Sequence, residues 1–157
     1  MLKRFYKIGF LAAMIAVSGY FAGVKAQSVS GSIGNGTVTP GKVARATVVL
    51  SLPAGLHANS NHPGSEYAIA TTIHATGNGI RIGPVFYPRG KNRKFQFSDN
   101  TINVYEGRTA FSFNVTVPAN YRGSNIRVNA TVRYQACTNE VCYPPKSKQI
   151  TLTARVQ

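Results

Sequence analysis

Two cysteines, Cys137 and Cys142, are the residues whose type and spacing in this sequence point to chemistry. They flank residues 138–141, follow a segment in which apolar and polar residues alternate strictly, and precede a Tyr-Pro-Pro run. This arrangement predicts a β-hairpin with one cysteine on each limb. Directly opposed residues of an antiparallel pair lie about 4.5 to 5.5 Å apart at Cα, a separation that a disulfide accepts. The two thiols can therefore meet without distorting the sheet.

The function of such a disulfide has two interpretations. A bridge across so short a loop removes little entropy from the unfolded chain, so it stabilises a fold less than a long-range bridge does. A local, accessible bridge is also easier to reduce. Pro144 and Pro145 lack backbone N–H groups, so they interrupt pairing beside Cys142 and leave its sulfur open to a docking chain. The residues alone leave open a redox-active pair or a structural bridge in a non-enzymatic binding module.

A metal centre is a rival interpretation, because His57, His62 and His74 could join the cysteines in a metal site. His57 and His62 fall in an Asn- and Ser-rich segment that we expect to be a loop, with no strand to hold them at ligand spacing. We therefore expect no metal ion. Hydrolase chemistry also lacks support, because the acidic residues form no recognisable catalytic spacing. The four acidic residues are Glu66, Asp99, Glu106 and Glu140.

The N-terminus has the pattern of an export signal. Three basic residues precede an apolar run over 8–23, and small or apolar residues follow. The run has about 16 residues, whereas a spanning helix needs about 20, which disfavours an uncleaved anchor. We expect a signal peptide over 1–26, cleaved between Ala26 and Gln27. The domain over 27–157 would then be periplasmic or secreted, without stable insertion in a membrane.

Composition excludes several classes of protein. The 157 residues carry 18 Lys and Arg against 4 Asp and Glu, a net charge of +14, yet charged residues make up only 14%. Disordered chains and coiled coils carry far more charge, so we expect one domain with a hydrophobic core. Four basic residues lie in the signal peptide, and its removal would lower the net charge to +10. The remaining basic residues are scattered apart from Lys91, Arg93 and Lys94, so we expect a solvated basic face and no nucleic-acid partner. We also expect a monomer.

The rest of the chain repeats with a period of two, which is typical of strands that bury one face. The strongest runs are 43–52, 111–117, 126–136 and 150–156, and shorter ones are 28–33, 67–75, 80–87 and 101–105. Turn residues rich in Pro and Gly separate the runs, and no sustained helical stripe is present. Seven or eight short strands at this spacing predict an all-β fold, an immunoglobulin-like antiparallel β-sandwich.

The hairpin sequence VRYQACTNEVCYPP, residues 132–145, resembles the active-site hairpin of the N-terminal domain of the DsbD thiol:disulfide interchange protein family. Three weaker motifs match the same pattern in order and spacing: GLHANS at 55–60, YPRG at 87–90 and VYEG at 104–107. The resemblance extends over most of the mature chain. It implies an immunoglobulin-like periplasmic domain whose cysteine pair relays electrons.

The resemblance also implies roles for the residues of the hairpin. Cys142 matches the cysteine that forms a mixed disulfide with a partner, and Cys137 matches the cysteine that resolves it. The residues that flank the pair in the matched motif are Tyr134, Gln135, Tyr143, Pro144 and Pro145. The chemistry is attack of a thiolate on a disulfide sulfur, which uses no metal ion and no organic cofactor.

The resemblance further implies partners. In the family, a membrane-embedded domain and a thioredoxin-like domain pass reducing equivalents to this domain. It then reduces periplasmic proteins such as disulfide isomerases and the thioredoxin of cytochrome c maturation. This sequence ends at Gln157, directly after the last expected strand, without those two domains. We therefore expect an activity of the protein-disulfide reductase type that depends on a separate thioredoxin-like electron donor and acts on disulfide-bearing periplasmic partners.

The family shields its cysteines with a cap loop whose aromatic ring swings aside when a partner docks. The corresponding region here is 94–100, in which Phe97 is the first candidate for that ring and Phe95 the second. The alternative is that both rings are core residues of a strand, because they keep a period of two. The polar residues after Phe97 favour a loop. The stretch 91–94 is basic where some relatives have acidic residues, which affects the choice of partner and the pKa of the thiols.

Overall fold

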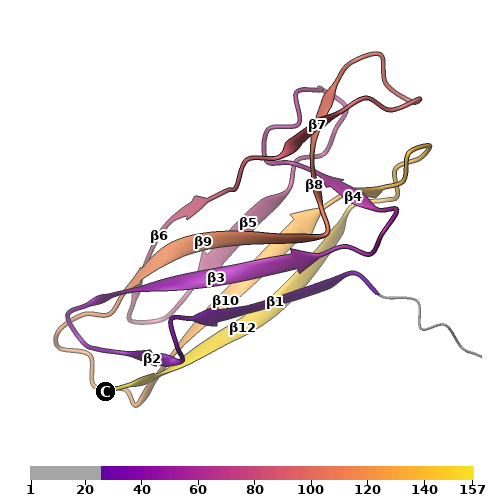
Figure 1. Ribbon diagram of the computed structural model, residues 1–157. Coiled ribbons are helices and arrows are strands. Elements are labelled where there is room, and N and C mark those ends of the chain that lie inside the picture. Colours follow the sequence, from indigo (N-terminus) through magenta and orange to yellow (C-terminus); the bar gives the residue numbers. More distant parts are fainter. Residues whose placement is uncertain (1–25) are drawn as a thin grey trace, which may run out of the picture.

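The computed structural model describes residues 26–157 and shows an all-β fold (Figure 1). The predicted signal peptide, residues 1–26, lies outside the described residues except for Ala26. Strands joined by turns and loops make up the described part, where no helix has the length and apolar character needed to cross a membrane.

Twelve strands follow one another along the described chain. The first six are β1 (Ser28–Ile33), β2 (Thr37–Val38), β3 (Val43–Ser51), β4 (His57–Asn59), β5 (Thr72–Thr76) and β6 (Arg81–Phe86). The last six are β7 (Lys91–Arg93), β8 (Ile102–Glu106), β9 (Arg108–Thr116), β10 (Asn125–Tyr134), β11 (Ala136–Cys137) and β12 (Lys146–Val156).

Two four-stranded sheets form the layers of a sandwich (Figure 1). The first sheet has the order β1-β3-β9-β6, and the second has the order β2-β12-β10-β5. Neighbouring strands run antiparallel, except that the short β2 pairs in parallel with the end of β12. The predicted immunoglobulin-like antiparallel sandwich is confirmed.

The inward faces of the two sheets share one hydrophobic core. Along β10 every second residue from Ile126 to Tyr134 is buried, and the residues between them face outward. Strand β9 contributes Phe111 and Phe113, which have no exposed surface. Burying an apolar side chain of this size is worth about 1.5–3 kcal/mol, so the period of two in the sequence is the main reason that the strands pack in this way.

A third sheet, in the order β11-β4-β8-β7, lies at one end of the sandwich (Figure 1). Its strands continue from both layers, because β4 follows β3, β8 precedes β9 and β11 follows β10. Gly107 lies between β8 and β9 with φ +62°, a conformation that favours glycine. Its carbonyl oxygen accepts a hydrogen bond from the backbone N–H of Leu52 at 2.9 Å. The chain that follows β3 and the chain that precedes β9 therefore leave the first sheet at the same point.

Most expected strands are present, although only β1 has the expected bounds, and three of the differences have a clear structural cause. The expected strand 67–75 is shortened to β5, because the chain before it bonds to the loop after β4: the N–H of Thr71 donates to the carbonyl of Ser60 at 3.1 Å. The expected strand 126–136 is interrupted at Gln135, where the chain passes from the second sheet to the third. The expected strand 150–156 starts earlier, at Lys146, because β12 pairs with the whole of β10.

Three strands were not expected, namely β2, β4 and β7. Each has two or three residues, which is too short for a period of two to be visible. The expectation that residues 57–62 form a loop is therefore wrong for His57, which lies in β4 and is buried.

Candidate functional site

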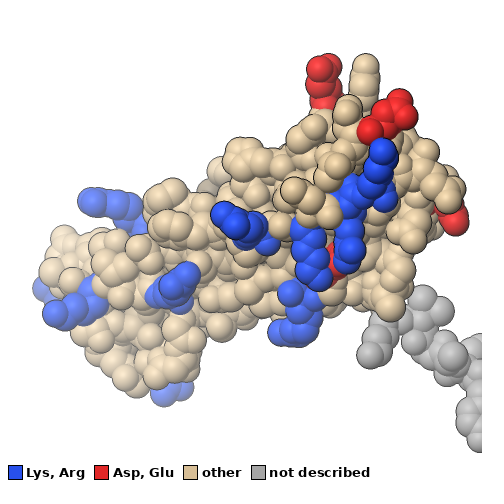
Figure 2. Space-filling model, turned by 45° about the horizontal axis from the view of Figure 1, so that its top comes forward, with Lys and Arg blue, Asp and Glu red and all other residues tan. Residues whose placement is uncertain are grey.

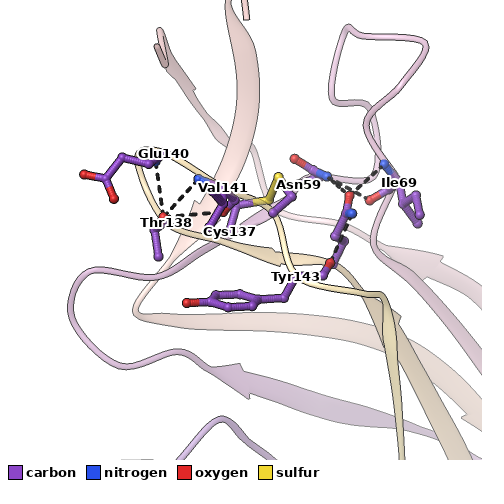
Figure 3. Close-up of a disulfide and its surroundings, with 9 residues drawn as sticks. Asn59, Ile69, Cys137, Thr138, Glu140, Val141 and Tyr143 are labelled. Carbon is purple, nitrogen blue, oxygen red and sulfur yellow. Dashed lines mark hydrogen bonds between the residues drawn. A yellow bond between two sulfur atoms is a disulfide. The ribbon is translucent and has the colours of Figure 1, made fainter. Parts of the chain in front are cut away.

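The disulfide between Cys137 and Cys142 lies at the β11 edge of the third sheet, and Figure 3 shows its surroundings. The two residues face each other across an antiparallel bridge, with Cα atoms 4.0 Å apart. The backbone N–H of Thr138 donates to the carbonyl of Val141 at 2.8 Å, and the N–H of Tyr143 donates to the carbonyl of Ala136 at 2.9 Å. These bonds lie on either side of the cysteines, so the pair occupies a non-hydrogen-bonded position, where opposed side chains come closest.

The hydroxyl of Thr138 holds the loop between the cysteines (Figure 3). Its oxygen accepts hydrogen bonds from the backbone N–H of Glu140 at 3.2 Å and of Val141 at 3.1 Å. Local bonds of this kind satisfy backbone donors that a tight loop otherwise leaves to solvent. Thr138 therefore fixes the conformation in which Cys142 is presented.

Replacing Thr138 by valine should lower the free energy of unfolding of the oxidised protein by about 1 kcal/mol, because the two backbone donors lose their acceptor. Urea unfolding measures this change. Thr138→Ser is the matched control, since it keeps the acceptor and should stay within about 0.5 kcal/mol of wild type. A valine variant as stable as the serine variant would show that the hydroxyl does not hold the loop.

The two cysteines differ in accessibility. Cys137 has no exposed surface, whereas Cys142 is exposed. Val141 is 54% exposed and Tyr143 is 43% exposed, so Cys142 lies between two apolar side chains that face solvent. A reagent or partner thiol can therefore reach Cys142 but not Cys137.

The segment 94–100 lies over the face of the third sheet that carries the disulfide. Phe95 is buried there in a small hydrophobic core with Ile102, Val104 and the partly buried Ala68. This core is separate from that of the sandwich, which receives Ala58, Tyr105 and Ala136 from the opposite face of the same sheet. Both faces of the third sheet are thus covered, which explains why Cys137 and Ala136 are buried although they are neighbours in sequence.

Phe97 lies in a turn and is 40% exposed. It lines a pocket of about 160 Å³ together with Cys142. The other residues that line this pocket are Asn59, Ser65, Tyr67, Ala68, Ser98, Ile102 and Gln135. Tyr67 is 92% exposed, so this Cys142 pocket opens between two aromatic side chains. The structure therefore brings Phe97, but not the deeper Phe95, to the mouth of the pocket beside Cys142.

Three rings form a continuous stack beneath that mouth. Phe97 stacks on Phe95 with ring centroids 5.2 Å apart, and Phe95 stacks on the imidazole of His57 at 4.2 Å. The planes are almost parallel in both pairs, at 4° and 10°. Phe95 therefore connects the exposed ring to strand β4, and neither phenylalanine belongs to a strand.

Gln135 connects the hairpin to the loops around it. Its side-chain oxygen accepts hydrogen bonds from Asn59 Nδ2 at 3.1 Å and from the N–H of Ile69 at 3.4 Å. Its Nε2 donates to the carbonyl of Tyr143 at 3.2 Å. Gln135, which lies between β10 and β11, thus joins the cysteine hairpin to the loops that border the Cys142 pocket.

The other flanking residues lie apart from this network. Tyr134 is fully buried in the core of the sandwich, and its hydroxyl donates to Gln27 Oε1 at 2.9 Å. Pro144 and Pro145 are exposed between the cysteine hairpin and β12. They leave positions 144 and 145, directly after Tyr143, without backbone donors.

The charges at this end are mixed. Figure 2 shows Lys and Arg spread over the face in view, whereas acidic side chains gather at one end. Glu106 accepts hydrogen bonds from Arg93 at 3.0 Å and from Lys91 at 3.2 Å. Hydrogen bonding to Arg93 holds the pKa of the Glu106 carboxyl below its ordinary value, although burial opposes the shift. The basic stretch 91–94 is therefore partly neutralised where it meets the site.

The three histidines lie in different parts of the fold and do not form a cluster. It is buried in β4, whereas His62 is exposed in the following loop and His74 is exposed on β5 of the second sheet. In residues 26–157 no three His, Cys, Asp or Glu side chains gather closely enough to hold a metal ion. Burial lowers the pKa of His57, while Glu106 raises it and Arg93 lowers it further.

The lowered pKa of His57 predicts a pH-dependent stability. Below about pH 6.5 the unfolded chain binds a proton on this histidine that the folded chain does not bind. The free energy of unfolding should therefore fall as the pH drops through 6.5 towards the folded-state pKa, by at most about 1.4 kcal/mol per pH unit. Urea unfolding between pH 5 and 8 should show a shallower slope for His57→Phe, which keeps a ring against Phe95. Equal slopes would contradict the prediction.

Comparison with known protein families shows which family the chain belongs to. The family model described as "Thiol:disulfide interchange protein DsbD, N-terminal" matches residues 36–154. The chain belongs to this DsbD N-terminal family. The match spans β2 to β11 and most of β12, with all of the third sheet and both cysteines, so the disulfide hairpin is part of the DsbD N-terminal unit. The matched residues fall within the domain expected over 27–157.

One solved periplasmic domain has a similar fold. The chain is similar to the N-terminal periplasmic domain of ScsB from Proteus mirabilis, with 12% identity and a TM-score of 0.50 over 79% of this chain and 44% of that chain. A family 123 glycoside hydrolase from Clostridium perfringens gives 11% identity and a TM-score of 0.41 over 82% of this chain and 27% of that chain. The chain thus spans less than half the length of either structure. No curated protein sequence matches it.

Sequence reasoning did not assign His57, Asn59 or Tyr67 to the site. Asn59 and His57 lie in GLHANS, one of the motifs that carry the family resemblance. This motif was the sequence feature that could have placed them at the site. Tyr67 was placed in a strand, whereas it lies in the loop that borders the Cys142 pocket.

Proposed function

We propose that this chain is an exported thiol:disulfide exchange domain. In this proposal it relays reducing equivalents from a thioredoxin-like donor to disulfide-bearing periplasmic proteins through Cys137 and Cys142. The observation that carries the proposal is the asymmetry of the disulfide, in which one cysteine is exposed beside a pocket and the other is fully buried. Membership of the DsbD N-terminal family supports it.

The asymmetry supports an order of events. A thiolate of the donor attacks Sγ of Cys142, the sulfur that solvent reaches, and the bond to Cys137 breaks. The sulfur of Cys137 leaves as a thiolate and takes up a proton. A second thiolate of the donor then attacks its own sulfur in the mixed disulfide, which releases Cys142 and leaves a reduced pair with an oxidised donor. The same steps in reverse reduce a partner that carries a disulfide.

The segment 94–100 acts as the cap in this proposal. Phe97 stands at the mouth of the Cys142 pocket, and its ring rests on Phe95 rather than in the main core. Displacing Phe97 therefore breaks one stacking contact without disturbing the sandwich. The exposed ring of Tyr67, on the other side of the pocket, adds apolar surface for a docking chain.

The proposal places the protein in the periplasm. The solved structure of similar fold is a periplasmic domain, and the N-terminal residues have the pattern of a signal peptide. An oxidising compartment suits a protein whose two cysteines form a disulfide.

Reduction by a dithiol donor tests the proposed function. The oxidised protein is mixed with equimolar reduced thioredoxin, and the redox state of its cysteines is read by alkylation and mass spectrometry. We expect reduction within minutes, and we expect thioredoxin with its second cysteine replaced by serine to form a mixed disulfide on Cys142. A protein that stays oxidised for hours and forms no adduct would contradict the proposal and leave a structural bridge.

A further inference from the structure

Four side chains form a row across the third sheet, on the face that the segment 94–100 covers. Cys142 lies opposite Cys137, Cys137 lies opposite His57 in the β11–β4 pair, and His57 lies opposite Glu106 in the β4–β8 pair. Directly opposed residues of antiparallel strands point to the same face, with Cβ atoms about 4.5–5.5 Å apart. His57 is therefore the neighbour of Cys137 on the side away from Cys142.

His57 is placed to exchange a proton with Cys137. The residue is 4% exposed, and its Nε2 is buried without a hydrogen-bond partner in the described structure. Buried polar atoms normally have a partner, and a redox or catalytic role is one reason for an unpartnered one. Neither sulfur of a disulfide carries a proton, whereas a reduced Cys137 would offer an S–H group to this nitrogen.

We propose that His57 accepts the proton of the Cys137 thiol when Cys137 resolves a mixed disulfide on Cys142, a role that rests on the proposed exchange function. Glutathione disulfide serves as the example of an oxidant. The Cys142 thiolate attacks it, forms a mixed disulfide with one glutathione and releases the other as a thiolate. Cys137 then attacks Sγ of Cys142 while its proton passes to His57. The Cys137–Cys142 bond forms, the second glutathione leaves, and two electrons have passed from the pair to glutathione disulfide.

The surroundings of His57 favour a base over a permanently charged group. Its ring packs on Phe95, and burial keeps it neutral at pH 7, with a pKa below the ordinary value. The charged groups that face it are Glu106 from β8, which stabilises the imidazolium as it forms, and Arg93 from β7, which opposes it. Arg93 forms an ion pair with Glu106. This ion pair holds the carboxylate of Glu106 in the row beside His57.

A second pocket borders His57. It has a volume of about 400 Å³ and is lined by His57 together with Glu106 and Asn139 among others. None of its lining residues lines the Cys142 pocket. A partner seated at Cys142 therefore leaves this second pocket open, and in the proposal the proton leaves His57 through it while the mixed disulfide is resolved.

Rapid quenching tests the role of His57. The reduced protein is mixed with glutathione disulfide, samples are quenched in acid, and mass spectrometry follows the glutathione adduct and its loss. His57→Phe keeps a ring against Phe95 but removes the base, so the adduct should form at a rate within about twofold of wild type and be lost at least tenfold more slowly at pH 7. His62→Phe, at an exposed histidine, is the matched control and should behave as wild type.

The pH profile separates this role from a merely structural one. In wild type the rate of adduct loss should inflect at the pKa that NMR gives for the His57 ring, and this inflection should be absent in His57→Phe. The wild-type profile alone decides the matter if the variant does not fold, because an inflection away from the His57 pKa would overturn the role. Equal rates of adduct loss and equal pH profiles in wild type and His57→Phe would also overturn this role, but they would leave the exchange function intact. A wild type that forms no adduct would contradict the exchange function itself.

Discussion

Replacing Cys137 by serine should leave a protein that captures glutathione on Cys142 and cannot release it, whereas Cys142→Ser should capture almost none. Cys142 is exposed at a pocket, and Cys137 has no exposed surface. Thiol reactivity follows access and thiolate character, so we expect adducts to form on Cys142 at least about 100-fold faster than on Cys137. In wild type the adduct should be short-lived, because Cys137 displaces it.

The two serine variants are controls for each other. Both lack the same cross-link, so any loss of stability from its removal is shared and cannot explain a difference in reactivity. The reaction is followed by intact mass after mixing each variant with glutathione disulfide at pH 7. Adduct formation at similar rates on both cysteines would mean that the burial of Cys137 does not govern the exchange.

Replacing Phe95 by alanine should release the cap and expose the disulfide. Phe95 is the ring between His57 and Phe97, and it forms the small core with Ile102 and Val104. Without it the segment 94–100 loses its apolar anchor and should detach from the sheet. We expect dithiothreitol to reduce the disulfide at least tenfold faster than in wild type, as followed by alkylation and mass spectrometry.

Two further variants locate the effect of Phe95. Phe97→Ala removes only the ring at the mouth of the pocket, so it should speed reduction less than Phe95→Ala. Phe111→Ala, in the main core, should cost about 3–5 kcal/mol of global stability, as full-sized core truncations do, without preferential exposure of the disulfide. Phe95→Ala should cost less than that, because its core is a separate cluster that can open locally. An unchanged rate of reduction in Phe95→Ala would mean that this segment does not control access to Cys142.

The two layers of the sandwich were predictable from sequence because their strands are long and bury one face. Strand β1 has the expected bounds, and β10 alternates over its whole length as expected. The hairpin that joins the cysteines was also predictable, since its turn lies between two residues whose side chains must meet. These features depend on neighbours in sequence or on a local period, which a single sequence displays.

The third sheet could not be predicted as a unit, because most of its strands have only two or three residues and β4 is buried on both faces. Strand β4 is buried at His57, Ala58 and Asn59, so no alternation marks it as a strand. Its partners β8 and β11 lie far along the chain, and only the fold brings Glu106 and Cys137 to either side of His57. The cysteine pair could therefore be identified from its motif, whereas the histidine beside it required the structure.

The reduction potential of the Cys137–Cys142 pair tests the central claim most directly. The protein is equilibrated in glutathione buffers of graded composition, and the fraction of dithiol is read by alkylation and mass spectrometry. An exchange domain should have a midpoint between about −120 and −270 mV, the range of proteins that pass electrons through dithiols. A pair that stays oxidised until the potential falls below about −300 mV would contradict the exchange function and identify the bridge as structural.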